Sequence, residues 1–225
     1  MEAVAGSRKL NSPRWMWPAF GVAAAVFFVA MGLEIEPLRF TFKALPVFTL
    51  AVGVYLTDPS TRFRRLVALG LLFGAIGDFE FGSFELTLAA FLVSHLIYIV
   101  AFTGVSRAAK PLLAIPYLAI GIGLTISLSE SAGDLLIPVA IYALVISVMG
   151  WRAAALVGEC DAAVSYPFAV GAALFILSDA LLAINRFHGD LPAADWLIMV
   201  PYLAAQGLIA LGAVRHQTGA HRDAI

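Results

Sequence analysis

Eight apolar stretches follow one another along the chain, and only short polar links separate them. One bilayer crossing needs about 20 mostly apolar residues in a helix. Because lipid offers no hydrogen-bond partners, the backbone of such a segment must satisfy its own polar groups, which a helix does. The pattern predicts an all-α integral membrane protein, a bundle of about eight transmembrane helices. The predicted spans are 17–33, 40–56, 66–82, 86–105, 112–128, 135–151, 164–185 and 196–214.

The composition agrees with a chain that is mostly membrane-embedded. Of the 225 residues, 61% are hydrophobic and 13% charged, against about 45–50% and about 25% in soluble proteins. These values exclude an ordinary soluble domain, a disordered chain and a nucleic-acid binder with a basic face. The single cysteine, Cys160, excludes an intrachain disulfide and a cysteine-based metal cluster.

One domain is expected, because no internal repeat or low-complexity tract interrupts the apolar pattern. We predict a short basic cytoplasmic segment over 1–16, a transmembrane domain over 17–214 and a short cytoplasmic tail over 215–225. The basic residues before the first apolar run resemble a signal peptide, but no cleavage site and polar mature domain follow. The first run is therefore expected to stay as a helix.

The distribution of positive charge predicts the orientation of the bundle. With eight spans and both termini on one side, that side collects eleven basic residues and the other two, Arg39 and Arg186. Cytoplasmic loops are enriched in Lys and Arg, so both termini should be cytoplasmic. The eleven are Arg8, Lys9, Arg14, Arg62, Arg64, Arg65, Arg107, Lys110, Arg152, Arg215 and Arg222. Acidic residues gather on the opposite side: Glu34, Glu36, Glu80, Glu85, Glu130, Asp134, Asp190 and Asp195.

Few polar side chains lie within the spans, and each is a functional candidate because a charge at membrane depth costs at least about 2.5–3.5 kcal/mol. Asp78 and Asp179 lie roughly 6 Å and 10 Å below the outer ends of their helices at about 1.5 Å per residue. Lys43 lies just within the second span, and His95 lies midway along the fourth. These groups arrive from different helices at a common depth, which favours a shared site.

Helical phase brings further polar groups to the same site. Tyr202 and Gln206 are four residues apart and His95 and Tyr98 three, so each pair shares a helix face. We predict a polar pocket that opens outward. Its predicted lining is Asp78, Asp179, Lys43, His95, Tyr98, Tyr142 and Tyr202. The glycines Gly70, Gly74 and Gly77 form a small-residue ridge that allows a neighbouring helix to approach closely.

Structural interpretations of these residues stay open. The aspartates could form ion pairs that lock helices together, for example with Lys43, and Lys43 could instead extend toward the lipid headgroups. His95 could be an interhelical hydrogen-bonding residue, and the tyrosines could serve packing alone.

Several chemistries are excluded at the sequence level. Three of the four histidines lie in loops or the tail, so a zinc site built from histidines is not expected. Ser94 and Ser178 lack the surroundings of a serine nucleophile, and no phosphate-binding glycine loop is present. We therefore expect no metal and no cofactor. Two buried carboxyl groups and water suffice for general acid–base hydrolysis, in which one carboxyl is protonated and the other ionised.

The polar residues form a series that resembles a known family. It runs through Gly77-Asp78, then Ala90-Phe91…His95-Leu96-Ile97-Tyr98 and Tyr142…Met149. It ends with Phe175…Ser178-Asp179…Asn185-Arg186-Phe187 and Tyr202…Ala205-Gln206. From about Lys43 to Leu211 the chain resembles the YhhN-type lysoplasmalogenases, which are multi-pass membrane proteins. It departs from them at Lys43-Ala44, where the family has Lys-Pro, and at Glu80.

The resemblance implies hydrolysis of the vinyl ether bond of lysoplasmalogens to a fatty aldehyde and glycerophosphocholine or glycerophosphoethanolamine. Partners would be a lysophospholipid substrate and membrane lipids, in a bacterial inner membrane. Asp78 and Asp179 would be the catalytic acid and base, with the assignment between them open, and Lys43 or Arg186 would hold the phosphate. The substrate-binding residues would be Lys43, His95, Tyr98, Tyr142, Ser178, Asn185, Arg186, Tyr202 and Gln206.

Two other classes of function remain open from the sequence. A lipid or small-molecule transporter or receptor could use the buried charges as a relay, although no inverted repeat or pair of interrupted helices is visible. A scaffold whose ion pairs only hold helices would turn over no small molecule. Release of aldehyde from lysoplasmalogen would distinguish the enzyme from both.

Overall fold

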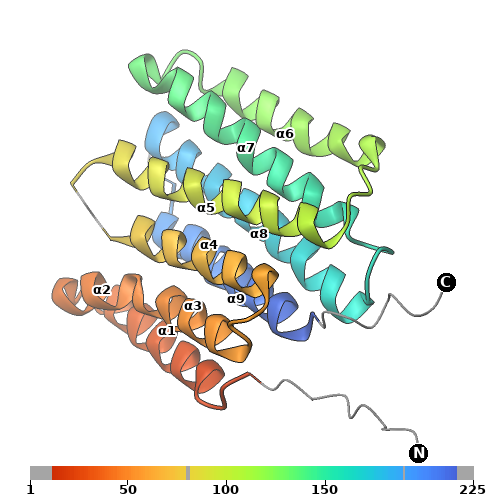
Figure 1. Cartoon of the computed structure of the whole chain (residues 1–225). Helices are drawn as coiled ribbons and strands as arrows, with labels where there is room; N and C mark the ends of the chain where they lie inside the picture. The colour runs from red at the N-terminus through yellow and green to blue at the C-terminus, as the bar shows by residue number, and fades with distance from the viewer. Residues whose placement is uncertain (1–11, 80–81, 190, 217–225) are drawn as a thin grey trace, which may run out of the picture.

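A computed structural model describes residues 12–79, 82–189 and 191–216. Within these ranges the chain is helical and contains no β-strand (Figure 1), as the apolar pattern predicted. The α-helices are α1 (Met16–Gly32), α2 (Glu36–Lys43), α3 (Leu45–Thr57), α4 (Arg62–Asp78), α5 (Phe84–Val105), α6 (Ala114–Ser127), α7 (Leu136–Ala155), α8 (Ala162–His188) and α9 (Ala194–Arg215). Two short 3-10 helices, η1 (Pro111–Leu113) and η2 (Gly133–Leu135), precede α6 and α7.

Successive helices such as α4 and α5, or α8 and α9, pack as antiparallel neighbours, as short connections require. The most extensive packing is between α8 and α9, followed by α4 with α5, and then equally by α3 with α4 and α6 with α7. Helix α5 also packs on α7, and α7 lies against both α6 and α8. Figure 1 shows α1 to α3 at one side of the bundle and α6 with α7 at the other. Helices α4, α5, α8 and α9 lie between them and carry Asp78, His95, Asp179 and Tyr202 respectively.

Each predicted span overlaps a helix, but α4 ends at Asp78, before the predicted end of the third span at 82, and the second span is interrupted. Helix α2 ends at Lys43 and α3 starts at Leu45, so 40–56 is not one continuous helix. Pro46 explains the break, because proline lacks the N–H that a continuous helix needs and its ring clashes with the carbonyl four residues earlier. By length and composition, five helical stretches can each cross a membrane. They are Glu36–Thr57, Phe84–Val105, Gly133–Ala155, Ala162–His188 and Ala194–Arg215. A total of eight crossings stays a prediction.

Two buried arginines organise one end of the bundle. Arg64 donates to the backbone carbonyls of Ala213 (3.1 Å), Val214 (3.3 Å) and His216 (2.6 Å), which end α9. Arg152 of α7 donates to the carbonyls of Ser106 (2.6 Å) and Ala108 (2.9 Å) after α5. The start of α4 and the ends of α5, α7 and α9 therefore lie at the end of the bundle that carries predicted cytoplasmic arginines. Arg8, Lys9, Glu80, Asp190, Arg222 and most of the two predicted terminal segments lie outside the described residues.

The glycine ridge of α4 faces side chains of the candidate site. A Cβ on Gly70 would lie 2.4 Å from the Tyr98 ring, and one on Gly74 would lie 2.6 Å from Nε2 of Gln206. A Cβ on Gly77 would lie 2.7 Å from the Phe91 ring. The absence of side chains along this ridge is what lets α5 and α9 bring large polar and aromatic groups against α4.

Candidate active site

Asp78, the last residue of α4, is held in a buried chain of hydrogen bonds. The hydroxyl of Tyr202 donates to Oδ2 of Asp78 at 2.7 Å, and Nε2 of Gln206 donates to the Tyr202 hydroxyl at 3.3 Å. Tyr98 of α5 donates to Oε1 of Gln206 at 3.0 Å. All four side chains are buried. This Asp78 network joins α4, α5 and α9, and its packing fixes the position of the carboxyl group.

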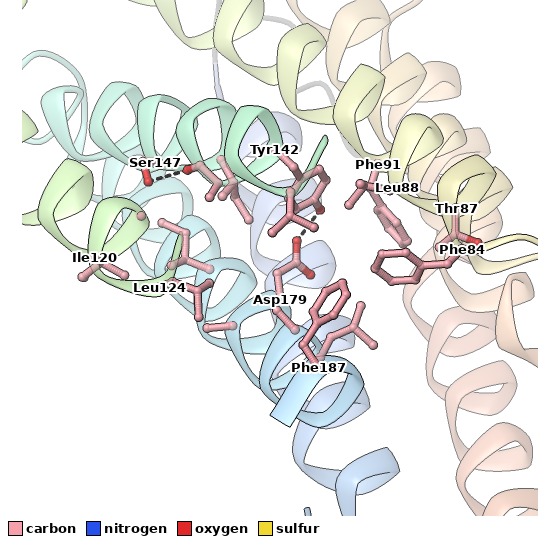
Figure 2. A pocket seen from close by; sticks show the side chains of 18 residues that line it. Phe84, Thr87, Leu88, Phe91, Ile120, Leu124, Tyr142, Ser147, Asp179 and Phe187 are labelled. Atoms are coloured by element: carbon pink, nitrogen blue, oxygen red, sulfur yellow. Dashed lines mark hydrogen bonds between the residues drawn. The ribbon is translucent and has the colours of Figure 1, made fainter. Parts of the chain in front are cut away.

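Asp179 of α8 forms a second network with different helices. The hydroxyl of Tyr142 on α7 donates a short hydrogen bond to Oδ2 of Asp179, as Figure 2 shows. The same oxygen lies 4.0 Å from Nε2 of His95 on α5. The Asp179 side chain keeps 13% of its surface exposed, whereas Asp78 as a whole keeps 4%. Of the two carboxyl groups, Asp179 is the more accessible.

His95 is oriented by the backbone of its own helix. Its Nδ1 forms a short hydrogen bond with the carbonyl of Phe91. Since a carbonyl can only accept, Nδ1 carries the proton, and a neutral ring then has its lone pair at Nε2. Nε2 is buried, with no hydrogen-bond partner among the described residues. An acceptor thus faces the Asp179 carboxyl across a gap that a small ligand or water could bridge.

Two phenylalanines separate the networks. Phe175 contacts the rings of Tyr202 and His95, with ring centroids 5.4 Å and 4.6 Å away. Phe91 contacts both Phe175 and Tyr202. Asp78 nevertheless interacts electrostatically with Asp179 and with Lys43. The predicted single polar pocket is therefore two hydrogen-bonded networks within electrostatic reach, divided by aromatic rings.

An apolar pocket adjoins the Asp179 network and lies between α5, α6, α7 and α8 (Figure 2). Phe84 and Phe187 line one end of it, near the start of α5 and the end of α8. Ile120, Ile146 and Ile176 line it further inward, one from each of α6, α7 and α8. Tyr142 and Asp179 lie between these two ends. A carboxyl group on the wall of an otherwise apolar pocket suits a substrate with an apolar part, and the free space of about 50 Å³ would take a short length of it.

Three predicted site residues make contacts elsewhere. Ser178 donates to the carbonyl of Ile198 at 2.9 Å and so joins α8 to α9. Oδ1 of Asn185 accepts from the backbone N–H of Leu191 at 2.8 Å. The guanidinium of Arg186 lies 5.5 Å from the centre of the Phe84 ring, at the end of the apolar pocket that Phe84 and Phe187 line.

The sequence does not indicate most of the pocket wall, although Tyr142 and Asp179 were predicted site residues. The rest is largely apolar and indistinguishable in sequence from lipid-facing residues, and α6 contributes Ile120, Gly121 and Leu124 without any polar marker. Among the described residues no group of three His, Cys, Asp or Glu side chains could hold a metal ion.

Comparisons with known proteins place the chain in a family. The YhhN family profile matches residues 38–213. Lysoplasmalogenase TMEM86B of Homo sapiens is 36% identical over 207 residues, which cover 90% of this chain and 87% of that protein. Lysoplasmalogenase TMEM86A of Bos taurus is 34% identical over 213 residues (87% of each chain). A lysoplasmalogenase of Mycobacterium tuberculosis is 29% identical over 214 residues, 85% of this chain and 80% of that one.

No solved structure matches the chain. The family profile covers most of the chain, and its relatives align over nearly their full length. Together with the five apolar helices, these matches show that the chain is an integral membrane protein and belongs to the YhhN family.

Proposed function

We propose that the chain is a membrane-embedded lysoplasmalogenase that hydrolyses the vinyl ether bond of lysoplasmalogens. The products would be a fatty aldehyde and glycerophosphocholine or glycerophosphoethanolamine. The observation that carries the proposal is the Asp179 carboxyl, held by Tyr142 on the wall of an apolar pocket. Relatives named lysoplasmalogenase over nearly the whole chain length support it.

Asp179 is the proposed general acid, because it is the carboxyl group that reaches the pocket. Its proton would pass to the vinyl carbon remote from the ether oxygen and leave an oxocarbenium ion at the adjacent carbon. Water would attack that carbon while the Asp179 carboxylate takes up one of its protons. The resulting hemiacetal collapses when the same proton reaches the glycerol oxygen, and the aldehyde departs. As the C=O bond of the aldehyde forms, the hemiacetal hydroxyl would give its proton to the Asp179 carboxylate, so Asp179 ends as the protonated acid with which it began. One water is consumed in total.

Asp78 has a different proposed role. As a carboxylate, it would stabilise the positive charge of the oxocarbenium ion from within electrostatic reach of Asp179. The Tyr202 hydroxyl keeps this carboxylate in place, and such a preorganised charge costs no reorganisation during the reaction. Lys43, which interacts with Asp78, or Arg186 beside Phe84 would hold the phosphate, and Tyr98, Tyr142, His95 and Gln206 would position the substrate and the carboxyl groups.

The test is aldehyde release by the purified protein, followed with a coupled dehydrogenase. Lysoplasmenylcholine and lysoplasmenylethanolamine are the substrates, and the 1-acyl and 1-alkyl lysolipids with the same headgroups are the controls. Turnover of the vinyl ether lipids alone supports the proposal. Turnover of the 1-acyl lipid would indicate general lipase action, and no turnover at all would favour a transporter, receptor or scaffold.

Asp179→Asn and Asp78→Asn examine the residue assignment. A general acid contributes typically about 10²- to 10⁴-fold, so Asp179→Asn should lose at least about 100-fold in kcat. Asp134→Asn, at an exposed position of the 3-10 helix η2 before α7, is the matched control. Unchanged thermal unfolding of each variant would show that it folds, and full activity in either folded variant would remove that aspartate from the mechanism.

We further propose eight membrane crossings with both termini in the cytoplasm of a bacterium, across its inner membrane. The clustering of Arg64, Arg152 and Arg215 at one end of the bundle supports this orientation. Single cysteines placed at Ser131 and Ser106 in a Cys160→Ser background would test it. A membrane-impermeant thiol reagent added outside intact cells should label position 131 and not 106, and the reverse pattern would overturn the orientation.

A further inference from the structure

A groove on the surface of the bundle runs between α3 and α4, which pack side by side and are joined by a short turn (Figure 1). Its volume is about 370 Å³. On each helix the lining residues recur three and seven positions apart, so each helix turns one face toward the groove. They include Phe48, Ala51 and Tyr55 of α3 and Arg65, Ala68 and Leu72 of α4.

Small residues form the floor of this α3/α4 groove and large ones its rim. Ala51 and Ala68 are buried in the core of the bundle. Phe48, Tyr55 and Leu69 also line the groove, and each keeps more than 40% of its surface exposed. A floor of methyl groups between large apolar side chains suits a flexible hydrocarbon chain.

The groove has one polar end and one apolar end. Tyr55 and Arg65 are its lining residues nearest the turn between the two helices, and Phe48 and Leu72 lie seven residues further along, or about 10 Å. An arginine can lay its apolar stem over hydrocarbon while its guanidinium reaches the headgroups, and tyrosine is frequent at membrane interfaces. Since one leaflet contributes about 15 Å of hydrocarbon, the groove matches the upper part of one acyl chain below a headgroup.

The polar end of the groove carries positive charge that no neighbouring acid neutralises. Arg62 and Arg65 are exposed, and neither forms an ion pair with another residue that the structure describes. Asp58 is the only acid within 57–66, and its carboxylate is already paired with the buried Arg64. A guanidinium can donate two parallel hydrogen bonds to a phosphate. The charge therefore favours a headgroup with a net negative charge over a neutral one.

We propose that the α3/α4 groove binds an anionic phospholipid of the surrounding bilayer. One acyl chain lies along Ala51 and Ala68, and the phosphate accepts hydrogen bonds from the Arg65 guanidinium and the Tyr55 hydroxyl. The second chain stays among the neighbouring lipids. The apolar pocket beside Asp179 is lined by α5, α6, α7 and α8, so this lipid site is separate from it and does not depend on the proposed hydrolysis.

The charge at the site is tested by native mass spectrometry of the full chain in detergent, with phosphatidylglycerol and phosphatidylcholine of identical acyl chains. The wild type should bind phosphatidylglycerol at least about fivefold more tightly, since one arginine beside anionic lipid contributes a factor of about five. Arg65→Gln should lose most of this preference and bind phosphatidylcholine as before. Arg107→Gln, which removes an exposed arginine after α5, is the matched control and should keep the preference.

The place of the acyl chain is tested by filling the groove. Val52 also lines it, and Val52→Trp should weaken binding of both lipids at least about fivefold, because the ring overlaps the chain. Val22→Trp makes the same change at an exposed position of α1 and should bind as the wild type does. Thermal unfolding checks that each variant folds, and Leu72→Trp fills the same groove where Val52→Trp does not.

Three results would overturn the proposal. Equal losses in Arg65→Gln and Arg107→Gln would show a diffuse attraction to the charged end of the bundle. Unchanged lipid binding in a folded Val52→Trp or Leu72→Trp protein would show that the groove holds no acyl chain. Displacement of phosphatidylglycerol by soluble glycerol phosphate at equal concentration would assign the arginine to a free phosphate instead.

Discussion

The hydroxyl of Tyr202 donates a 2.7 Å hydrogen bond to Oδ2 of Asp78 and so joins α9 to the C-terminal end of α4. Gln206 and Tyr98 extend this bond into a chain across three helices. Asp179 instead accepts from Tyr142 and lies beside the apolar pocket. Environment therefore gives the two carboxyl groups different partners and different access to a substrate.

Tyr202→Phe should destabilise the protein by about 1–3 kcal/mol, because it leaves a buried carboxyl oxygen without its donor. The free energy of unfolding in detergent, from a denaturant titration, measures the effect. Tyr166→Phe is the matched control, since Tyr166 lies on α8 with 56% of its surface exposed. Equal stability of the two variants would show that the Asp78 network contributes nothing to folding.

The same substitution should also lower kcat with little change in KM, because the hydroxyl contacts Asp78 and the proposed substrate lies beside Asp179. Tyr142→Phe is expected to lower kcat further, as it removes the donor of the carboxyl group that would touch the substrate. Steady-state kinetics on the folded variants provide the comparison. A rise in KM alone for either variant would assign that tyrosine to substrate binding instead.

Much of this arrangement could be predicted from the sequence, because helices in lipid carry few charges and each one is conspicuous. The positions of the helices and the gathering of Asp78, Tyr202 and Gln206 followed from apolar runs and helical phase. The division into two networks could not be predicted, since it depends on where Phe91 and Phe175 place their rings. The periodicity of a sequence predicts which face of a helix a residue lies on. It does not predict which neighbouring helix that face contacts.

The burial of an arginine could likewise not be predicted from the sequence. Arg64 lies between the exposed Arg62 and Arg65 and was counted with them as a cytoplasmic charge. In the structure it is fully buried and bonds the last carbonyls of α9. The last carbonyls of a helix have no hydrogen-bond donor within that helix. The sequence does not show which side chain supplies the donor until the packing of α4 against α9 is known.

Arg64→Lys should therefore cost about 2–4 kcal/mol of unfolding free energy, because a lysine offers one ammonium in place of a planar fork of donors. Arg65→Lys makes the same substitution at a neighbouring residue that is exposed. Its unfolding free energy should stay within about 0.5 kcal/mol of wild type. Thermal unfolding and denaturant titration of the two variants compare them. Similar losses in both would contradict the role of Arg64 in ending α9.

His216, which follows α9, should make stability depend on pH. Burial, together with the nearby Arg64 guanidinium, lowers the pKa of His216 below its ordinary value of 6.5. The unfolded chain then binds the proton more readily than the folded one, so stability is full above about pH 6.5 and falls as the pH drops below it. Unfolding free energies measured between about pH 7.5 and 5 should show this fall, and His216→Phe should reduce its slope. An unchanged slope in that variant would exclude His216 as the origin.

Two substitutions of His95 should separate an effect on folding from an effect on catalysis. His95→Asn keeps a donor near the position of Nδ1, which bonds the Phe91 carbonyl, but it loses the Nε2 acceptor that faces Asp179. His95→Phe loses both groups. If Nε2 binds water or substrate beside Asp179, both variants should lose about 10- to 100-fold in kcat, whereas His95→Asn should be the more stable of the two in thermal unfolding. Wild-type kcat in a folded His95→Asn protein would restrict His95 to joining helices, the structural alternative that its sequence position left open.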